Sequence, residues 1–221
     1  MGAGADQVAH EKQVAATAAA QLVEDGMRVG LGTGSTVGYF LEALADRRCD
    51  VRCVATSPRT ASRARTLGLV VEEFDALDVL DLAVDGADQV APDGWIVKGA
   101  GGALTREKVV AASSTSYVVI VDSSKLVERL MAPVPLELMA YGLASTLRRL
   151  GAASLRDAAR TPDGGVLADY RGEVADVAAL AERLSSVPGV VEHGLFAPTL
   201  ITKVLVGRGD SATPVSPGGW T

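Results

Sequence analysis

Short runs of branched apolar residues alternate with amphipathic or alanine-rich stretches over residues 1–132, and this alternation constrains the fold most strongly. The pattern predicts helices at 5–24, 37–46, 58–67 and 104–113 and strands at 27–31, 51–55, 69–72, 80–84, 95–98 and 117–121. Ser57 and Pro58 form a helix start, with a capping hydroxyl before proline at the first helical position. Strands that alternate with helices form βαβ units and a buried, largely parallel sheet. We therefore expect an α/β protein with a mostly parallel, Rossmann-like sheet and helices on both faces.

The pattern changes near residue 133. Strands are predicted at 134–138, 153–159, 166–170 and 190–195, with helices at 140–150 and 176–186. The order β-α-β-β-α-β is that of a ferredoxin-like α+β domain. A strand at 202–206 is expected to return to the first sheet, and the glycine- and proline-containing tail 207–221 to be mobile. The predicted division is 1–132 with 202–221 for the Rossmann-like domain and 133–201 for the smaller domain.

Composition excludes several classes of protein. The chain has 221 residues, enough for a sizeable core, and its net charge of −6, without a basic patch, argues against a nucleic-acid partner. Cys49 and Cys53 have no histidine nearby, so they are interpreted as reduced thiols and not as zinc ligands. No apolar run reaches the about 18 residues of a membrane span, and no signal-peptide pattern precedes the first helix. We expect a soluble, cytoplasmic protein with no membrane partner.

The segment Gly32-Thr33-Gly34-Ser35-Thr36 follows a predicted strand and opens a predicted helix. Hydroxyl groups and free backbone N–H groups at a helix start can hold a phosphate. The segment is not a Walker A loop, because no Gly-Lys-Ser/Thr follows, and it lacks the third glycine of a dinucleotide fingerprint. An ordinary strand-to-helix turn remains the alternative for this segment alone.

Acidic and basic side chains follow two further apolar runs. Asp85 and Asp88 come after the strand at 80–84, while Lys98 and a glycine-rich turn precede Glu107. Each of these residues also has an ordinary structural explanation. Asp85 and Asp88 could form a turn around Gly86, Lys98 could extend to solvent, and Glu107 could be a first-turn acid that interacts with the helix dipole. Their concurrence at strand ends, where open α/β sheets bind ligands, favours proton transfer on a small, phosphorylated substrate.

The chain resembles type A ribose-5-phosphate isomerases through motifs at 29–36, 84–88, 98–108 and 121–125, and through 133–137 and 188–196 in the second domain. Its departures are Gln89, where the family usually has an acid, and Ala100 in the glycine run. The resemblance implies that Glu107 is the catalytic base and that Asp85, Asp88 and Lys98 are also catalytic. It implies substrate contacts for Thr33, Gly34, Ser35, Thr36, Asp85, Gly86, Ala87, Asp88, Lys98, Gly99, Ala100, Gly101 and Lys125.

The implied reaction interconverts ribose 5-phosphate and ribulose 5-phosphate, a step of the non-oxidative pentose phosphate pathway. One carboxylate can move the proton between C1 and C2 through an enediolate, while a lysine stabilises charge on the substrate oxygen. No cofactor is implied, and no metal site, because no acid or histidine cluster has ligand spacing. The family also implies a homodimer or homotetramer.

Two alternatives share such a fold. A sugar-phosphate sensor would bind without turnover, but residues 1–25 are too short for a basic helix-turn-helix module. An amino-sugar-phosphate deaminase or an acyl-CoA transferase is the second alternative. The deaminase would be expected to use a catalytic histidine, and the chain has only His10, interpreted as a surface residue, and His193, interpreted as structural.

Overall fold

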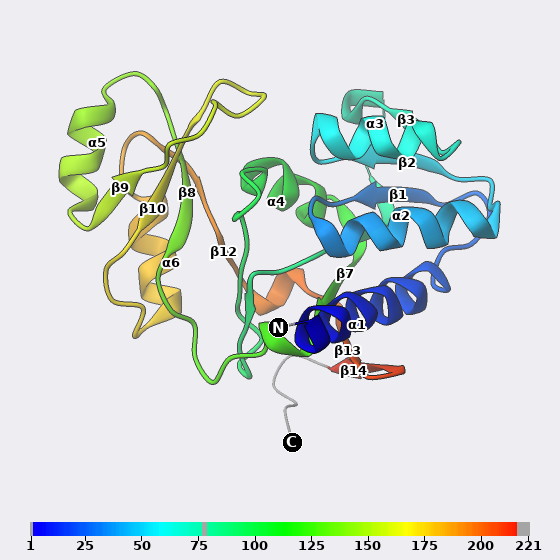
Figure 1. Cartoon of the computed structure of the whole chain (residues 1–221). Coiled ribbons are helices and arrows are strands. Elements are labelled where there is room, and N and C mark those ends of the chain that lie inside the picture. Colours follow the sequence, from blue (N-terminus) through cyan, green and yellow to red (C-terminus); the bar gives the residue numbers. More distant parts are fainter. Residues whose placement is uncertain (1, 77–78, 216–221) are drawn as a thin grey trace.

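The computed structural model describes residues 2–76 and 79–215. Its largest sheet has the strand order β14-β13-β7-β4-β1-β2-β3 (Figure 1). All neighbours are parallel except the last hairpin, β13–β14. The strands are β1 (Arg28–Leu31), β2 (Arg52–Ala55), β3 (Val70–Glu72), β4 (Leu80–Asp85), β7 (Ser114–Asp122), β13 (Lys203–Arg208) and β14 (Ser211–Val215). The predicted Rossmann-like sheet is confirmed.

The order of this sheet reverses between β1 and β4. From β1 the chain proceeds outward through β2 and β3, and from β4 it proceeds the other way through β7 and β13. At such a switch point the loops that leave the two strands diverge and open a crevice beyond their carboxyl ends. The β1–β4 junction is therefore where the fold favours a ligand site.

Helices cover both faces of the sheet. The helices are α1 (Gly2–Ala20), α2 (Ser35–Arg47), α3 (Pro58–Thr66) and α4 (Leu104–Ala112). Residues of α1 and α2 share one apolar core with Leu31 and Val84, whereas Val110 of α4 packs with Ala83 and Val119 on the other face. The expected start of α3 is confirmed, because the Ser57 hydroxyl accepts from the backbone N–H of Thr60 and Pro58 opens the helix.

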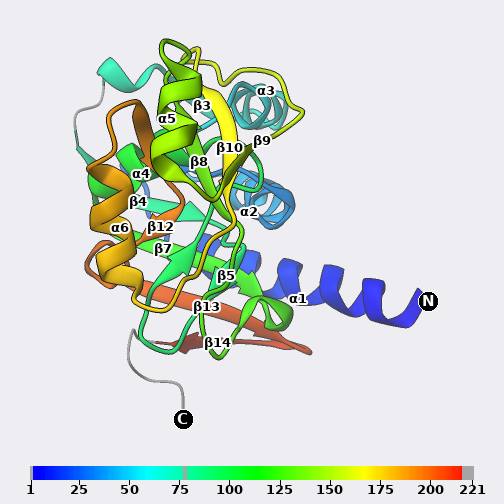
Figure 2. The ribbon, with the colours of Figure 1, turned by 90° about the vertical axis from the view of Figure 1, so that its left-hand side faces the viewer.

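A second, antiparallel sheet has the order β11-β8-β10-β9. Its elements are β8 (Val134–Leu138), α5 (Leu143–Leu150), β9 (Ala153–Leu155), β10 (Val166–Tyr170), α6 (Val177–Ser185) and β11 (Val190–His193). The predicted β-α-β-β-α-β order is confirmed. Helices α5 and α6 lie on the side away from the large sheet, nearest the viewer in Figure 2, and α4 contacts β8 and β11. Helix α4 is thus packed between the two sheets.

Three expectations are wrong in detail. The run at 95–98 does not join the parallel sheet, since β6 (Ile96–Val97) pairs antiparallel with β5 (Gln89–Val90) and β12 (Leu195–Phe196). The predicted strand 190–195 is accordingly divided between β11 and β12. The predicted strand 153–159 ends at Leu155; the Arg156 N–H still donates to the carbonyl of Leu167 on β10, and no strand is formed over the residues that follow.

The tail is a further correction. Residues 211–215, expected to be mobile, form β14, which pairs with β13 through a turn at Gly209 with φ of +53°. Residues 216–221 of the predicted tail lie outside the described residues.

The division into 1–132 with 202–221 and 133–201 stays a prediction. Strand pairing crosses the predicted boundary, because Phe196 of the second segment pairs with Ile96 of the first.

Candidate active site

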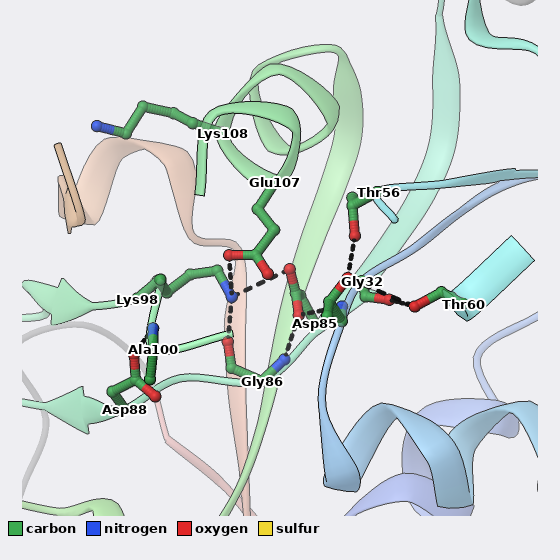
Figure 3. A network of polar contacts seen from close by, with 12 residues as sticks. Gly32, Thr56, Thr60, Asp85, Gly86, Asp88, Lys98, Ala100, Glu107 and Lys108 are labelled. Atoms are coloured by element: carbon green, nitrogen blue, oxygen red, sulfur yellow. Dashed lines mark hydrogen bonds and ion pairs between the residues drawn. The ribbon is translucent and has the colours of Figure 1, made fainter. Parts of the chain in front are cut away.

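The site lies at the β1–β4 switch point. The carboxylate of Asp85, at the end of β4, accepts hydrogen bonds from the backbone N–H groups of Thr33 at 3.1 Å and Gly86 at 2.7 Å (Figure 3). Gly32 lies so close to this carboxylate that a Cβ atom there would overlap it. The glycine after β1 therefore lets the two strand ends approach, and Asp85 joins the loops that leave them.

Lys98 is at the centre of a buried ionic cluster. Its Nζ lies 3.0 Å from Oδ2 of Asp85 and 3.3 Å from Oε2 of Glu107, and it donates to the carbonyl of Gly86 at 2.5 Å (Figure 3). All three ionisable side chains are only 3% exposed. Lys98 is fixed from the small three-stranded sheet, where its backbone N–H donates to the carbonyl of Gly194 at 2.8 Å.

Burial perturbs the protonation of this cluster. It raises the pKa of Glu107 to about 8, and the charge of Asp85 adds to this while Lys98 opposes it. Burial likewise raises the pKa of Asp85 against the opposing charge of Lys98. Burial alone would lower the pKa of Lys98, but the charges of Asp85 and Glu107 outweigh it and hold that pKa well above its usual value. A carboxyl that titrates near neutral pH can both accept and return a proton.

Beside the cluster is a pocket of about 210 Å³. This volume is below the range of about 300–1,000 Å³ for drug-sized ligands, so the pocket suits a small one. The lining residues are Lys12, Thr33, Gly34, Ser35, Thr36, Gly86, Ala87, Asp88, Lys98, Gly99, Ala100, Gly101, Glu107 and Lys125. The structure thus gathers the predicted site residues around one pocket, except that Asp85, which is paired with Lys98, is not a lining residue. Their roles stay predictions at this point.

An anion can bind where α2 begins. Gly34 precedes α2 with φ of +127° and no side chain caps the helix, so its first N–H groups face the pocket that Ser35 and Thr36 line. The loop is braced from α3, since the Thr60 hydroxyl donates to the carbonyl of Gly32 at 2.9 Å. The hydroxyl of Thr33 also forms a hydrogen bond of 2.8 Å with the hydroxyl of Thr56, which follows β2.

Two lysines flank this helix start. Lys125 follows β7 in a short 3-10 turn (Ser123–Lys125), and Lys12 reaches the pocket from α1, where its Nζ donates to the Ser35 hydroxyl at 3.1 Å. The turn is held by Glu11, which accepts from the Ser123 N–H at 3.0 Å and hydroxyl at 2.6 Å. These bonds, led by the Ser123 hydroxyl, lower the pKa of Glu11 to about 2. No sequence pattern marks Lys12 or Glu11 as site residues, because they lie in an alanine-rich helix with no motif.

The histidines lie elsewhere. His193 is buried, its ring contacts the Ser185 hydroxyl at 3.0 Å, and burial lowers its pKa to about 4. His10 is half-exposed and lies 2.7 Å from Asp210.

Over residues 2–76 and 79–215, no group of three or more His, Cys, Asp or Glu side chains could hold a metal ion. None of the helices in those residues is long and apolar enough to cross a membrane.

The fold and the pocket together define an α/β protein with a small pocket beside a buried carboxyl–lysine cluster. The profile of the family "Ribose 5-phosphate isomerase A (phosphoriboisomerase A)" matches residues 52–211. A ribose-5-phosphate isomerase A from Caulobacter sp. (strain K31) is 42% identical over 94% of this chain and 98% of its own length. The chain belongs to the ribose 5-phosphate isomerase A family.

Solved structures agree with this assignment. The crystal structure of ribose 5-phosphate isomerase A from Neisseria gonorrhoeae superposes with a TM-score of 0.90 at 29% identity, covering 95% of this chain and 97% of that one. A D-ribose-5-phosphate isomerase in complex with phospho-erythronic acid superposes with a TM-score of 0.89 at 32% identity, covering 95% and 99%. The match covers 95% of this chain and so extends over its three sheets, and the fold is that of the family.

Proposed function

We propose that this chain interconverts ribose 5-phosphate and ribulose 5-phosphate through an enediolate. The observation that carries the proposal is the Glu107 carboxyl, which lines the pocket with a pKa raised to about 8 and lies 3.3 Å from the ammonium group of Lys98. A base and a cation side by side are what proton transfer next to a carbonyl requires. The solved relative in complex with phospho-erythronic acid, a phosphorylated sugar acid, supports a sugar phosphate as ligand.

The phosphate binds at the start of α2. Backbone N–H groups and the hydroxyls of Ser35 and Thr36 donate to its oxygens, and Lys12 and Lys125 supply opposite charge. This group lies away from the reacting carbons, so its binding energy orients the sugar without taking part in the chemistry.

The sugar then faces Glu107. The carboxylate removes the proton from C2 of the open-chain aldose, and the electron pair moves to the carbonyl oxygen on C1 as the enediolate forms. Lys98 stabilises that negative charge. The same carboxyl returns the carbon-bound proton to C1 while the hydroxyl proton on O2 is transferred to the negatively charged O1, which gives the ketose with a C2 carbonyl, a C1 hydroxyl and no net change in atoms.

The two aspartates have different tasks. Asp88 lines the pocket, where its carboxylate accepts from sugar hydroxyls and assists opening of the furanose ring. Asp85 does not line the pocket and holds the ammonium group of Lys98 in place through their 3.0 Å ion pair. Asp85 therefore acts on the substrate through Lys98.

We further propose that the chain forms a homodimer or homotetramer and works in the cytoplasm.

The direct test is conversion of ribose 5-phosphate to ribulose 5-phosphate by the purified chain, with unphosphorylated ribose as the control. Turnover of the phosphorylated sugar and very poor turnover of ribose are expected. Tight binding of ribose 5-phosphate without turnover would instead identify a sensor.

A further inference from the structure

Arg156 joins the four-stranded sheet to the glycine-rich loop of the pocket. It follows β9 directly, and its side chain is 17% exposed. Its Nε and Nη2 atoms donate to Oδ1 of Asp169, on β10, at 2.9 and 2.6 Å. The pair fixes the guanidinium plane, since an arginine fork is rigid and charge-assisted bonds are short and directional.

The remaining nitrogen of Arg156 turns toward the loop. Its Nη1 donates to the carbonyl of Gly99 at 2.8 Å and lies 3.4 Å from that of Ala100. A trans peptide directs its C=O and its N–H in opposite directions, and the carbonyl of Gly99 and the N–H of Ala100 belong to one peptide group. That N–H donates to Oδ2 of Asp88 at 2.9 Å (Figure 3). Arg156 and Asp88 therefore hold the same peptide group from its two sides.

The loop has little of its own to fix this peptide. Gly99 has φ of +103°, and a Cβ atom there would crowd Leu104 and Pro135 at 2.9 Å. Ala100 and Gly101 are exposed, and neither carries a polar side chain. Within the loop, the Gly99 carbonyl also accepts from the N–H of Gly102 at 3.1 Å, so this oxygen is shared between the turn and Arg156. The orientation of the peptide is therefore set by the turn together with the contacts to Arg156 and Asp88.

We propose that Arg156 is a positioning residue for the isomerisation, and that it acts through the Gly99–Ala100 peptide to aim Asp88 at the sugar. With Oδ2 of Asp88 occupied by the Ala100 N–H, its other oxygen is directed to the substrate. The proposal rests on the function proposed above. It also connects the four-stranded sheet to catalysis, because Asp169 lies on β10 and Arg156 directly follows β9.

Loss of this anchor should lower kcat more than it raises KM. The phosphate contacts at the start of α2 are untouched, whereas a catalytic group displaced by about 1 Å can cost about a hundredfold in rate. For Arg156→Ala we expect kcat to fall by about tenfold to a hundredfold and KM to change less than about threefold. Arg156→Lys should also be impaired, since one ammonium group cannot bond Asp169 and Gly99 in the same geometry.

Arg171 provides a matched control. Its Nη2 lies 3.5 Å from the same Asp169 carboxylate and its Nε donates to the Ser154 hydroxyl at 3.0 Å, but its side chain is 60% exposed and forms no hydrogen bond or ion pair with the glycine loop among the described residues. Arg171→Ala removes a cation from Asp169 without touching the glycine loop, so kcat should stay near that of the wild type.

The experiment measures kcat and KM for wild type, Arg156→Ala, Arg156→Lys, Asp169→Asn and Arg171→Ala, each without and with millimolar guanidinium. The proposal predicts low kcat for the first three variants, restoration of the Arg156→Ala variant by guanidinium, and little change for the control. Equal kcat values for the Arg156 variants and the control would overturn it, and so would a loss expressed mainly in KM. If the Arg156→Ala variant does not fold, the kcat values of Arg156→Lys and Asp169→Asn test the proposal in its place. An inactive wild type would refute the proposed function instead, so the two failures are distinct.

Discussion

Removal of Lys98 should destabilise the protein through two carboxyl groups left without their counter-charge. Methionine has nearly the length of lysine but no charge, so Lys98→Met preserves packing while Asp85 and Glu107 remain buried at 3% exposure. Breaking a buried ion pair by deleting one partner costs about 3–5 kcal/mol. For a domain of this size each kcal/mol lowers Tm by about 2–4 °C, which gives a loss of about 6–20 °C.

The loss should depend on pH. Burial already raises the pKa of both carboxyls in the wild type, and deletion of the cation raises them further. The folded variant then binds more protons than the unfolded chain, so its stability falls as pH rises. Differential scanning calorimetry at about pH 6 and about pH 9 should show the larger deficit at the higher pH.

Lys12→Met is the control, since Lys12 lines the same pocket but bonds the Ser35 hydroxyl and belongs to no buried ion pair among the described residues. Its Tm should change by only a few degrees. A deficit for Lys98→Met that is independent of pH, or no larger than that of the control, would refute the reasoning.

Three other predictions concern turnover. The kcat/KM of the free enzyme should rise with pH through an apparent pKa of about 8, which belongs to the Glu107 cluster; a flat pH–rate profile over that range would contradict the assigned base. Lys125→Ala should raise KM for ribose 5-phosphate by about tenfold or more, because the phosphate loses a charged donor, and unchanged steady-state kinetics would remove Lys125 from the site. Exhaustive chelation with EDTA should leave activity intact, since the proposed mechanism assigns stabilisation of the developing charge to Lys98; loss restored by a divalent ion would contradict that assignment.

Local patterns in the sequence predicted most of the fold. The alternation of apolar runs and helices gave the parallel sheet, because each βαβ unit is a local feature. Asp85 and the loop after Gly32 could be placed together in advance, since parallel strands end at the same edge of a sheet. The start of α3 could also be predicted, because its capping residue, Ser57, and the proline at the first helical position are adjacent in the sequence.

Contacts between distant segments could not be predicted. Lys98 is placed by β6, a strand of two residues whose partner Phe196 lies a hundred positions later, so no local pattern marks that pairing. Lys12 approaches the pocket only because α1 packs beside α2. The strand β14 contains Pro214, which usually argues against a strand but is tolerated at a sheet edge.

The central claim is that Glu107 moves a proton between C1 and C2, and isotope exchange tests it most directly. In deuterium oxide the wild type should convert ribose 5-phosphate to ribulose 5-phosphate with deuterium entering at C1, as followed by proton NMR. Glu107→Gln keeps the size of the side chain but cannot accept the proton, so both turnover and deuterium entry should fall by about a hundredfold to ten-thousandfold while ribose 5-phosphate still binds. Deuterium entry at the wild-type rate in the Glu107→Gln variant would contradict the account.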